Sequence, residues 1–154
     1  MNITVKSSSF KDGETIPSMY TCDGENISPH LVWSDPPADT KSIAVIADDP
    51  DAPMGTWVHW VVYNIPPETR ELPEKLPQGA KLPNGALQGV TDFGNEGYGG
   101  PCPPSGTHRY YFKVYALDIV FDSKAGTTKK QLVESMKGHI LAQGQIMGRY
   151  KRSR

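Results

Sequence analysis

Residues 42–65 read SIAVIADDPDAPMGTWVHWVVYNI. Residues 42–48 are apolar at almost every position, which is typical of a strand covered on both faces. Residues 56–65 form a second run, rich in the β-branched and aromatic side chains that favour strands. The Asp, Pro and Gly residues between the two runs favour a turn. The stretch therefore predicts two buried strands, and it places Asp49 and Asp51 just past the end of the first.

The second run should present two different faces, because successive side chains of a strand point to opposite sides. Simple alternation puts Trp57, His59, Val61 and Tyr63 on one face and Val58, Trp60 and Val62 on the other. His59 is then expected at the start of a face that becomes apolar further along the strand.

A third strand is expected at residues 108–119, HRYYFKVYALDI. Alternation gathers His108 and four less polar side chains on one of its faces: His108, Tyr110, Phe112, Val114 and Ala116. Shorter elements are expected elsewhere, namely a strand within residues 2–7, a helix over 127–138 with a threonine cap, and a last strand within 139–150.

The 154 residues include 15 glycines and 14 prolines without a repeat period. Prolines this frequent exclude long helices from most of the chain, and the glycines indicate many turns. The tract 66–106 is long, but its interspersed Leu, Val, Phe and Tyr favour an ordered loop packed on a sheet. We therefore expect a single, mainly β domain over residues 1–154.

The charges of the chain nearly cancel. Lys and Arg number 16 and Asp and Glu number 17, so the formal net charge is −1. No overall field attracts nucleic acid or an anionic membrane. The first residues, MNITVKSSSF, lack the apolar core of a signal peptide, and no run is apolar enough to span a membrane. We therefore expect a cytoplasmic protein with no nucleic-acid partner and no stable membrane anchoring.

The two cysteines, Cys22 and Cys102, are too few for a disulfide framework, and their spacing is not that of a zinc motif. In a protein expected in the cytoplasm, two separate thiols are favoured over a bridge.

Several polar side chains are expected to converge at strand ends: Asp49 and Asp51 after one strand, His59 on the next, and His108 with Tyr110 on the third. A histidine that shares one ring nitrogen with a carboxylate is fixed in tautomer, and its other nitrogen is free for a ligand. These groups together predict a small site rich in hydrogen-bond donors, suited to an anion.

Two neighbouring features fit an anion site. The glycine-rich segment 99–107, GGPCPPSGT, can offer backbone N–H groups, and Trp57 can form a wall that keeps the site partly dry. Each of these residues taken alone is more often structural than functional. It is their joint placement that favours a site.

A metal site is the alternative. Two histidines and a carboxylate are a known ligand set, so Asp49, His59 and His108 could hold a metal, with Asp51 as the base of a metal-dependent hydrolase.

Three motifs occur in order: DDPDAP at 48–53, WVHW at 57–60 and GPCPPSGTHRYYF at 100–112. Together they resemble the phosphatidylethanolamine-binding proteins, also called Raf kinase inhibitor proteins, and the segments CDGENISPHLVW and TDFGNEGYGGPCPP are similar to the bacterial and archaeal branch. The resemblance implies a large central antiparallel sheet, a second smaller sheet, one or two short helices, and a phosphate-binding pocket near one end of the large sheet.

The resemblance also implies which residues form that pocket. They are Asp49 and Pro53 of the first motif, Trp57 and His59 of the second, and Gly100, Pro101, His108 and Tyr110 of the third. Asp51, from the convergence of strand ends described above, is added to this predicted set of ligand-binding residues. The implied function is non-enzymatic binding of a phosphorylated or otherwise anionic ligand without a cofactor. The implied partners are a protein kinase or a serine protease, the latter inhibited through the loop 66–100, and a second copy of the chain in a homodimer.

Overall fold

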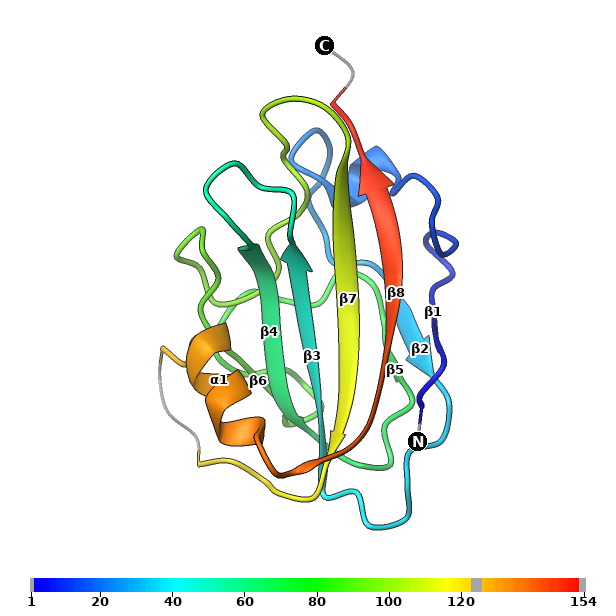
Figure 1. The fold of residues 1–154 in the computed structure, drawn as a ribbon, viewed down its shortest axis with the longest axis vertical. Coiled ribbons are helices and arrows are strands. Elements are labelled where there is room, and N and C mark those ends of the chain that lie inside the picture. Colours follow the sequence, from blue (N-terminus) through cyan, green and yellow to red (C-terminus); the bar gives the residue numbers. More distant parts are fainter. Residues whose placement is uncertain (1, 123–125, 153–154) are drawn as a thin grey trace.

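A computed structural model of the chain describes residues 2–122 and 126–152. Within these ranges eight strands form two antiparallel sheets, and there is one α-helix (Figure 1). The large sheet has the order β6-β4-β3-β7-β8, with bounds Leu87–Gln88, Trp57–Ile65, Ser42–Asp49, His108–Leu117 and Ile140–Tyr150. The small sheet has the order β1-β2-β5, with bounds Val5–Lys6, Leu31–Trp33 and Glu71–Leu72. The expected mainly β fold is confirmed.

Strand β3 is the centre of the large sheet. It pairs with β4 on one side and β7 on the other, and all eight of its residues are buried. Its alternate side chains enter two hydrophobic clusters, with Ile43 and Val45 on the side of the small sheet and Ala44 and Ile46 on the other. The prediction of a strand covered on both faces is therefore confirmed.

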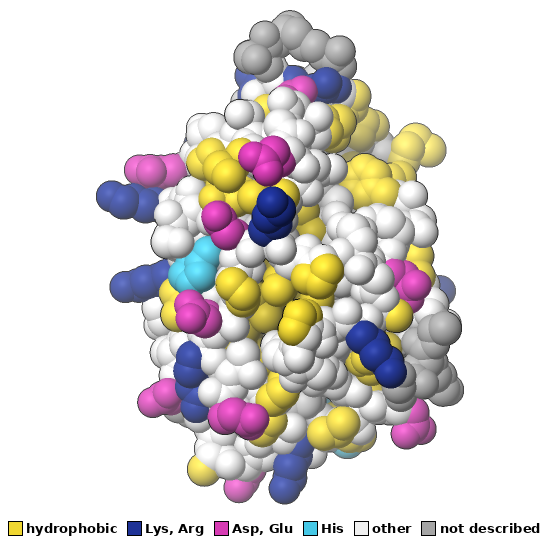
Figure 2. All heavy atoms as spheres, turned by 180° about the vertical axis from the view of Figure 1, so that it is seen from behind, with side chains coloured by type: hydrophobic (Ala, Val, Ile, Leu, Met, Phe, Trp, Pro, Cys, Tyr) yellow, Lys and Arg dark blue, Asp and Glu magenta, His cyan; other side chains and the backbone are white. Residues whose placement is uncertain are grey.

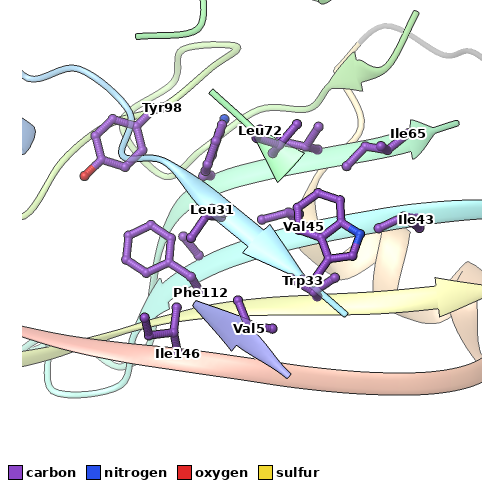
Figure 3. Close-up of a cluster of buried hydrophobic side chains, with 14 of the residues drawn as sticks. Val5, Leu31, Trp33, Ile43, Val45, Ile65, Leu72, Tyr98, Phe112 and Ile146 are labelled. Atoms are coloured by element: carbon purple, nitrogen blue, oxygen red, sulfur yellow. The ribbon is translucent and has the colours of Figure 1, made fainter. Parts of the chain in front are cut away.

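The main core lies between the two sheets (Figure 3). The small sheet contributes Val5, Leu31, Trp33 and Leu72, and the large sheet contributes Ile43, Val45, Ile65, Phe112 and Ile146. Burying a side chain of this size stabilises the fold by about 1.5–3 kcal/mol.

On the face that Figure 2 shows, opposite the helix, acidic and basic side chains are interspersed.

Helix α1, Lys129–Met136, covers part of the other face of the large sheet (Figure 1). The expected threonine cap is Thr128, whose side chain accepts a hydrogen bond from the backbone N–H of Gln131. The Gln131 side chain in turn accepts one from the N–H of Thr128, which completes a capping box. A short 3-10 helix, Ser18–Tyr20, lies near the amino terminus.

Strand β4 departs from simple alternation. Val58 pairs with Asp48 and Trp60 pairs with Ala47, so His59 is an extra residue in a β-bulge. Beyond the bulge the faces are exchanged. Val58, Val61 and Tyr63 belong to the cluster beneath α1, and Trp60 and Val62 to the core between the sheets. The expected grouping of Val58 with Trp60, and of His59 with Val61, was therefore wrong, because the bulge shifts the alternation by one residue. Val61 and Tyr63 share a face as expected, and so do Trp60 and Val62.

The tract 66–106 is held by specific contacts rather than by long strands. Buried Gln88 accepts a hydrogen bond from the indole N–H of Trp60 at 2.9 Å. Its amide nitrogen donates to the carbonyl oxygens of Pro77 at 2.9 Å and Gly79 at 2.8 Å. These bonds attach the loop to the large sheet.

Over the described residues, no helix is long and apolar enough to cross a membrane.

The amino-terminal segment crosses β8 at a glycine. The N–H of Ile3 donates to the carbonyl oxygen of Gln143 at 2.9 Å, and a Cβ atom at Gly144 would collide with the carbonyl oxygen of Ile3. A Gly144→Ala substitution should therefore lower the free energy of unfolding by about 1–3 kcal/mol, as overpacking does. Denaturant unfolding measures this. Gln143→Ala, which shortens an exposed side chain next to it, is the control, and equal stability of the two variants would contradict the close approach.

Candidate functional site

The candidate site is a pocket at the end of the large sheet where β3 ends and β4 and β7 begin. The loop 50–56 and the segment before β7 lie at this end (Figure 1). Antiparallel pairing brings these strand ends together. The pocket has a volume of about 200 Å³. Its lining residues are Asp49, Ala52, Pro53, Trp57, His59, Phe93, Cys102, Pro103, Pro104, His108 and Tyr110.

Asp49 organises one side of the pocket. Its side chain is buried, and Oδ2 accepts a hydrogen bond from Nδ1 of His108 at 2.6 Å. Oδ1 accepts one from the backbone N–H of Asp51 at 2.7 Å. Burial raises the pKa of Tyr110, and the charge of Asp49 and a hydrogen bond to it raise that pKa further. Because the Asp49 carboxylate accepts the hydrogen bond from Nδ1 of His108, it fixes the tautomer of that ring and leaves Nε2 for a ligand.

His59 is held differently. Its Nδ1–H donates to the carbonyl oxygen of Gly99 at 2.6 Å, so a backbone carbonyl orients it and not an acid as expected. Burial lowers the pKa of His59 below its ordinary value of 6.5. The ring is then neutral at neutral pH, and its Nε2 carries a lone pair instead of a proton. An anion without an O–H group can form a hydrogen bond with this nitrogen only after the ring takes up a proton.

Aromatic rings surround the His59 side chain. Phe93 makes edge contacts with the rings of His59 and Trp57, with ring centroids 5.2 Å and 5.5 Å apart. The ring centroids of Tyr110 and His59 are also 5.2 Å apart. Phe93 is 48% exposed, so it forms part of the rim. The preceding residue anchors it, because Asp92 accepts the N–H of Val58 at 2.7 Å. Sequence reasoning missed Phe93, although an aromatic residue within the glycine-rich DFGNEGYGG was an available signal.

A disulfide joins Cys22 to Cys102, with Cα atoms 5.4 Å apart, so the expectation of two separate thiols was wrong. Two hydrogen bonds hold the same segments together. The N–H of Cys22 donates to the carbonyl oxygen of Pro101 at 3.1 Å, and the N–H of Gly100 donates to Oδ1 of Asn26 at 2.8 Å. The cysteines are 80 residues apart in sequence. Only the folded chain brings them together, which their count and spacing could not show.

Six of the nine predicted residues line the pocket: Asp49, Pro53, Trp57, His59, His108 and Tyr110. Gly100 and Pro101 are not among the lining residues, and both form hydrogen bonds with the segment that carries Cys22 and Asn26. Asp51 turns away and forms a paired ion contact with Arg109, at 2.8 Å and 2.9 Å. The hydrogen bonds of Arg109 lower the pKa of Asp51 to about 2.

Two of the predicted backbone donors of the glycine-rich segment, at Gly99 and Gly100, are used within the protein. The N–H of Gly99 donates to the carbonyl oxygen of His59 at 2.9 Å, and the N–H of Gly100 is bonded to Asn26. Pro103 and Pro104 have no N–H to donate. These residues therefore offer the pocket fewer backbone donors than expected, and much of its polar lining comes from the two histidines. Cys102, Pro103 and Pro104 of this segment line the pocket, as expected for the segment before His108, whereas sequence reasoning missed Ala52.

The alternative of a metal site gains no support. Over residues 2–122 and 126–152, no group of three His, Cys, Asp or Glu side chains is arranged to hold a metal ion. Asp49 is bonded to Nδ1 of His108, and Nδ1 of His59 is bonded to a backbone carbonyl. Asp51, the proposed base, is engaged by Arg109.

Comparisons with known proteins agree on one family. The family model described as phosphatidylethanolamine-binding protein matches residues 6–151. Proteins named UPF0098 are 51% identical in Methanothermobacter thermautotrophicus, covering 97% of this chain and 99% of that protein, and 54% identical in Aquifex aeolicus, covering 96% and 88%.

Two crystal structures are also similar over nearly the whole chain. A homologue of phosphatidylethanolamine-binding protein from Chlamydia trachomatis has a TM-score of 0.89 at 43% identity and covers 99% of each chain. Escherichia coli YbcL, described as a member of the mammalian PEBP family, has a TM-score of 0.91 at 37% identity and covers 99% of this chain and 100% of its own.

The lowered pKa of His59 makes stability depend on pH. Below about pH 6.5 the unfolded chain binds a proton at this imidazole, whereas the folded chain does so only at lower pH. The unfolded state then holds more protons, so the free energy of unfolding should fall as pH drops from about 6.5 towards the folded-state pKa of His59. Denaturant unfolding at a series of pH values measures this decline.

A His59→Asn variant should show less of the decline, since asparagine has no titrating group but keeps an N–H donor for Gly99. The control is His139→Asn, which removes a histidine ring that is 40% exposed and does not line the pocket. The same pH dependence in wild type and His59→Asn would contradict the prediction.

Proposed function

The chain belongs to the phosphatidylethanolamine-binding protein family, and on that premise we propose that it is a non-enzymatic binding protein whose pocket receives a small anion, such as the phosphate group of a larger ligand. The observation that carries this proposal is that His59 and His108 line the same pocket of about 200 Å³. Each ring is held at Nδ1 by a fixed acceptor, so each has its Nε2 left for a ligand.

The surroundings of the two histidines favour a ligand that carries a negative charge. Proline and aromatic side chains line most of the pocket, and an electrostatic interaction is stronger in such a dry site than in water. A protonated imidazole next to a phosphate oxygen makes a charge-assisted hydrogen bond, which is about twice as strong as a neutral one. Binding is therefore coupled to protonation of His59.

Nothing in this pocket resembles an activated nucleophile. Its hydroxyl group belongs to Tyr110, and the pKa of that phenol is raised by burial and by Asp49, so it stays protonated. Asp49 is committed to His108 and to the loop backbone. These engagements favour a receptor over an enzyme.

Substitution of the histidines should weaken binding of inorganic phosphate. In His108→Asn the amide nitrogen can still donate to Asp49, but the ring nitrogen Nε2, which is left for a ligand, is lost. We expect a loss of affinity of about ten-fold or more for His108→Asn and for His59→Asn, because each removes the ring nitrogen Nε2 that would form a hydrogen bond with the anion. Isothermal titration calorimetry at pH 6 measures it. The matched control is His30→Asn on the small-sheet side, and unchanged affinity in both pocket variants would refute the pocket assignment.

Sulfate tests the coupling to protonation, because sulfate itself does not titrate between pH 5 and pH 8. Its affinity should rise as pH falls below about 6.5 and level off below the pKa that His59 has in the free protein. The affinity should rise because the bound anion favours the protonated His59 ring, whereas burial in the free protein favours the neutral ring. In His59→Asn the slope should become smaller. Constant sulfate affinity across this range in the wild type would contradict the coupling.

A further inference from the structure

A second polar hollow lies on the other face of the large sheet. It has a volume of about 350 Å³, and we call it the lysine groove. Its walls include Asp48, Arg109, Tyr111, Lys113, Lys129 and Gln145. Asp48 and Asp49 are consecutive residues of β3, so their side chains point to opposite faces. The lysine groove is therefore separated from the histidine pocket by the sheet itself.

The charges in the lysine groove do not balance. The side chain of Asp48 is only 2% exposed, and its Oδ2 atom contacts Nζ of Lys129 at 2.7 Å and Nζ of Lys113 at 3.2 Å. One lysine would suffice to neutralise this carboxylate. Arg109 does not change the sum, because it is paired with Asp51. Two ammonium groups thus share one carboxylate, which leaves one positive charge uncompensated.

Both ammonium groups have donors to spare. The side chains of Lys113 and Lys129 are 30% and 26% exposed, so they reach the solvent while touching Asp48. An ammonium group has three donors, and the bond to Asp48 uses one. An anion in the groove would receive hydrogen bonds from both and would relieve the repulsion between them.

Tyr111 fixes the geometry of the wall along β7. Its ring lies 5.8 Å from the guanidinium of Arg109 and 5.9 Å from Nζ of Lys113. Arg109 also donates to the Tyr111 hydroxyl at 3.3 Å. Lys113 pairs with Gln145 of β8, and Lys129 is the first residue of α1. The donors therefore come from three elements of the fold.

We propose that the lysine groove is a second anion site, which binds a phosphate-type oxyanion through Lys113 and Lys129. Two flexible ammonium groups that approach from different elements suit a compact anion with several oxygen atoms. A free phosphate ion and a phosphate group on a larger molecule share this chemistry.

Nuclear magnetic resonance of ¹⁵N-labelled protein tests the proposal. Inorganic phosphate is titrated at constant ionic strength against chloride. Thr56 and Gln145 both line the groove, and we expect shifts of their amides. A separate set of shifts is expected at Trp57 and Phe93 in the histidine pocket. If the Thr56 and Gln145 signals stay unchanged in the wild type, the groove proposal is overturned, whatever happens at the pocket.

Lys129→Met should weaken the groove isotherm about ten-fold, since it removes one charge-assisted donor and leaves Asp48 paired with Lys113. Lys130→Met, which changes an exposed lysine next to it, is the matched control. Asp48→Asn should strengthen phosphate binding in the groove several-fold, because the competing carboxylate is gone. A groove isotherm that survives Lys129→Met unchanged, or that weakens in Asp48→Asn, would overturn the proposal.

Repeating the titration with phosphoserine distinguishes the two sources of the oxyanion. Equal groove affinity for phosphate and phosphoserine indicates that a phosphate on a larger molecule is accepted. Binding of phosphate alone restricts the site to the free ion, and both results are compatible with a phosphate-type site.

Discussion

Two buried carboxylates at the end of the central strand β3 must each be compensated on a different face of the sheet. A charge removed from water is costly unless it is paired and hydrogen-bonded. Asp49 is paired with His108, and the loop backbone also donates to it. Asp48, on the opposite face, is paired with Lys113 and Lys129. The placement of these partners on β7 and α1 follows from this requirement.

The pairing of β3 with β4 and β7 makes these compensations possible. Because β3 is buried along its whole length, its end cannot move away from the strands beside it. The bulge at His59 adds one residue to β4 at the level of the carboxylates. It places His59 against Tyr110 and leaves Val58 on the opposite face. Because of this bulge, β4 lines the pocket and also contributes side chains to the hydrophobic clusters on both faces of the sheet.

Much of the fold could be predicted from local patterns. The apolar run at residues 42–48 and the alternation from His108 to Ala116 each indicated an element that the structure contains. The capping residue Thr128 likewise marked the start of the helix. Such patterns succeed because each depends on residues that are neighbours in sequence. The bulge at His59 was missed because no residue within β4 marks it.

The sequence by itself determined that Asp49, His59 and His108 lie close to the ends of predicted strands. Only the tertiary structure decided what each one bonds. Asp51 pairs with Arg109 instead of a histidine, and the carbonyl of Gly99 holds His59. Cys22 reaches Cys102 across 80 residues. The physical reason is that hydrogen bonds and disulfides form between atoms that are close in space, and strand pairing brings together residues far apart along the chain.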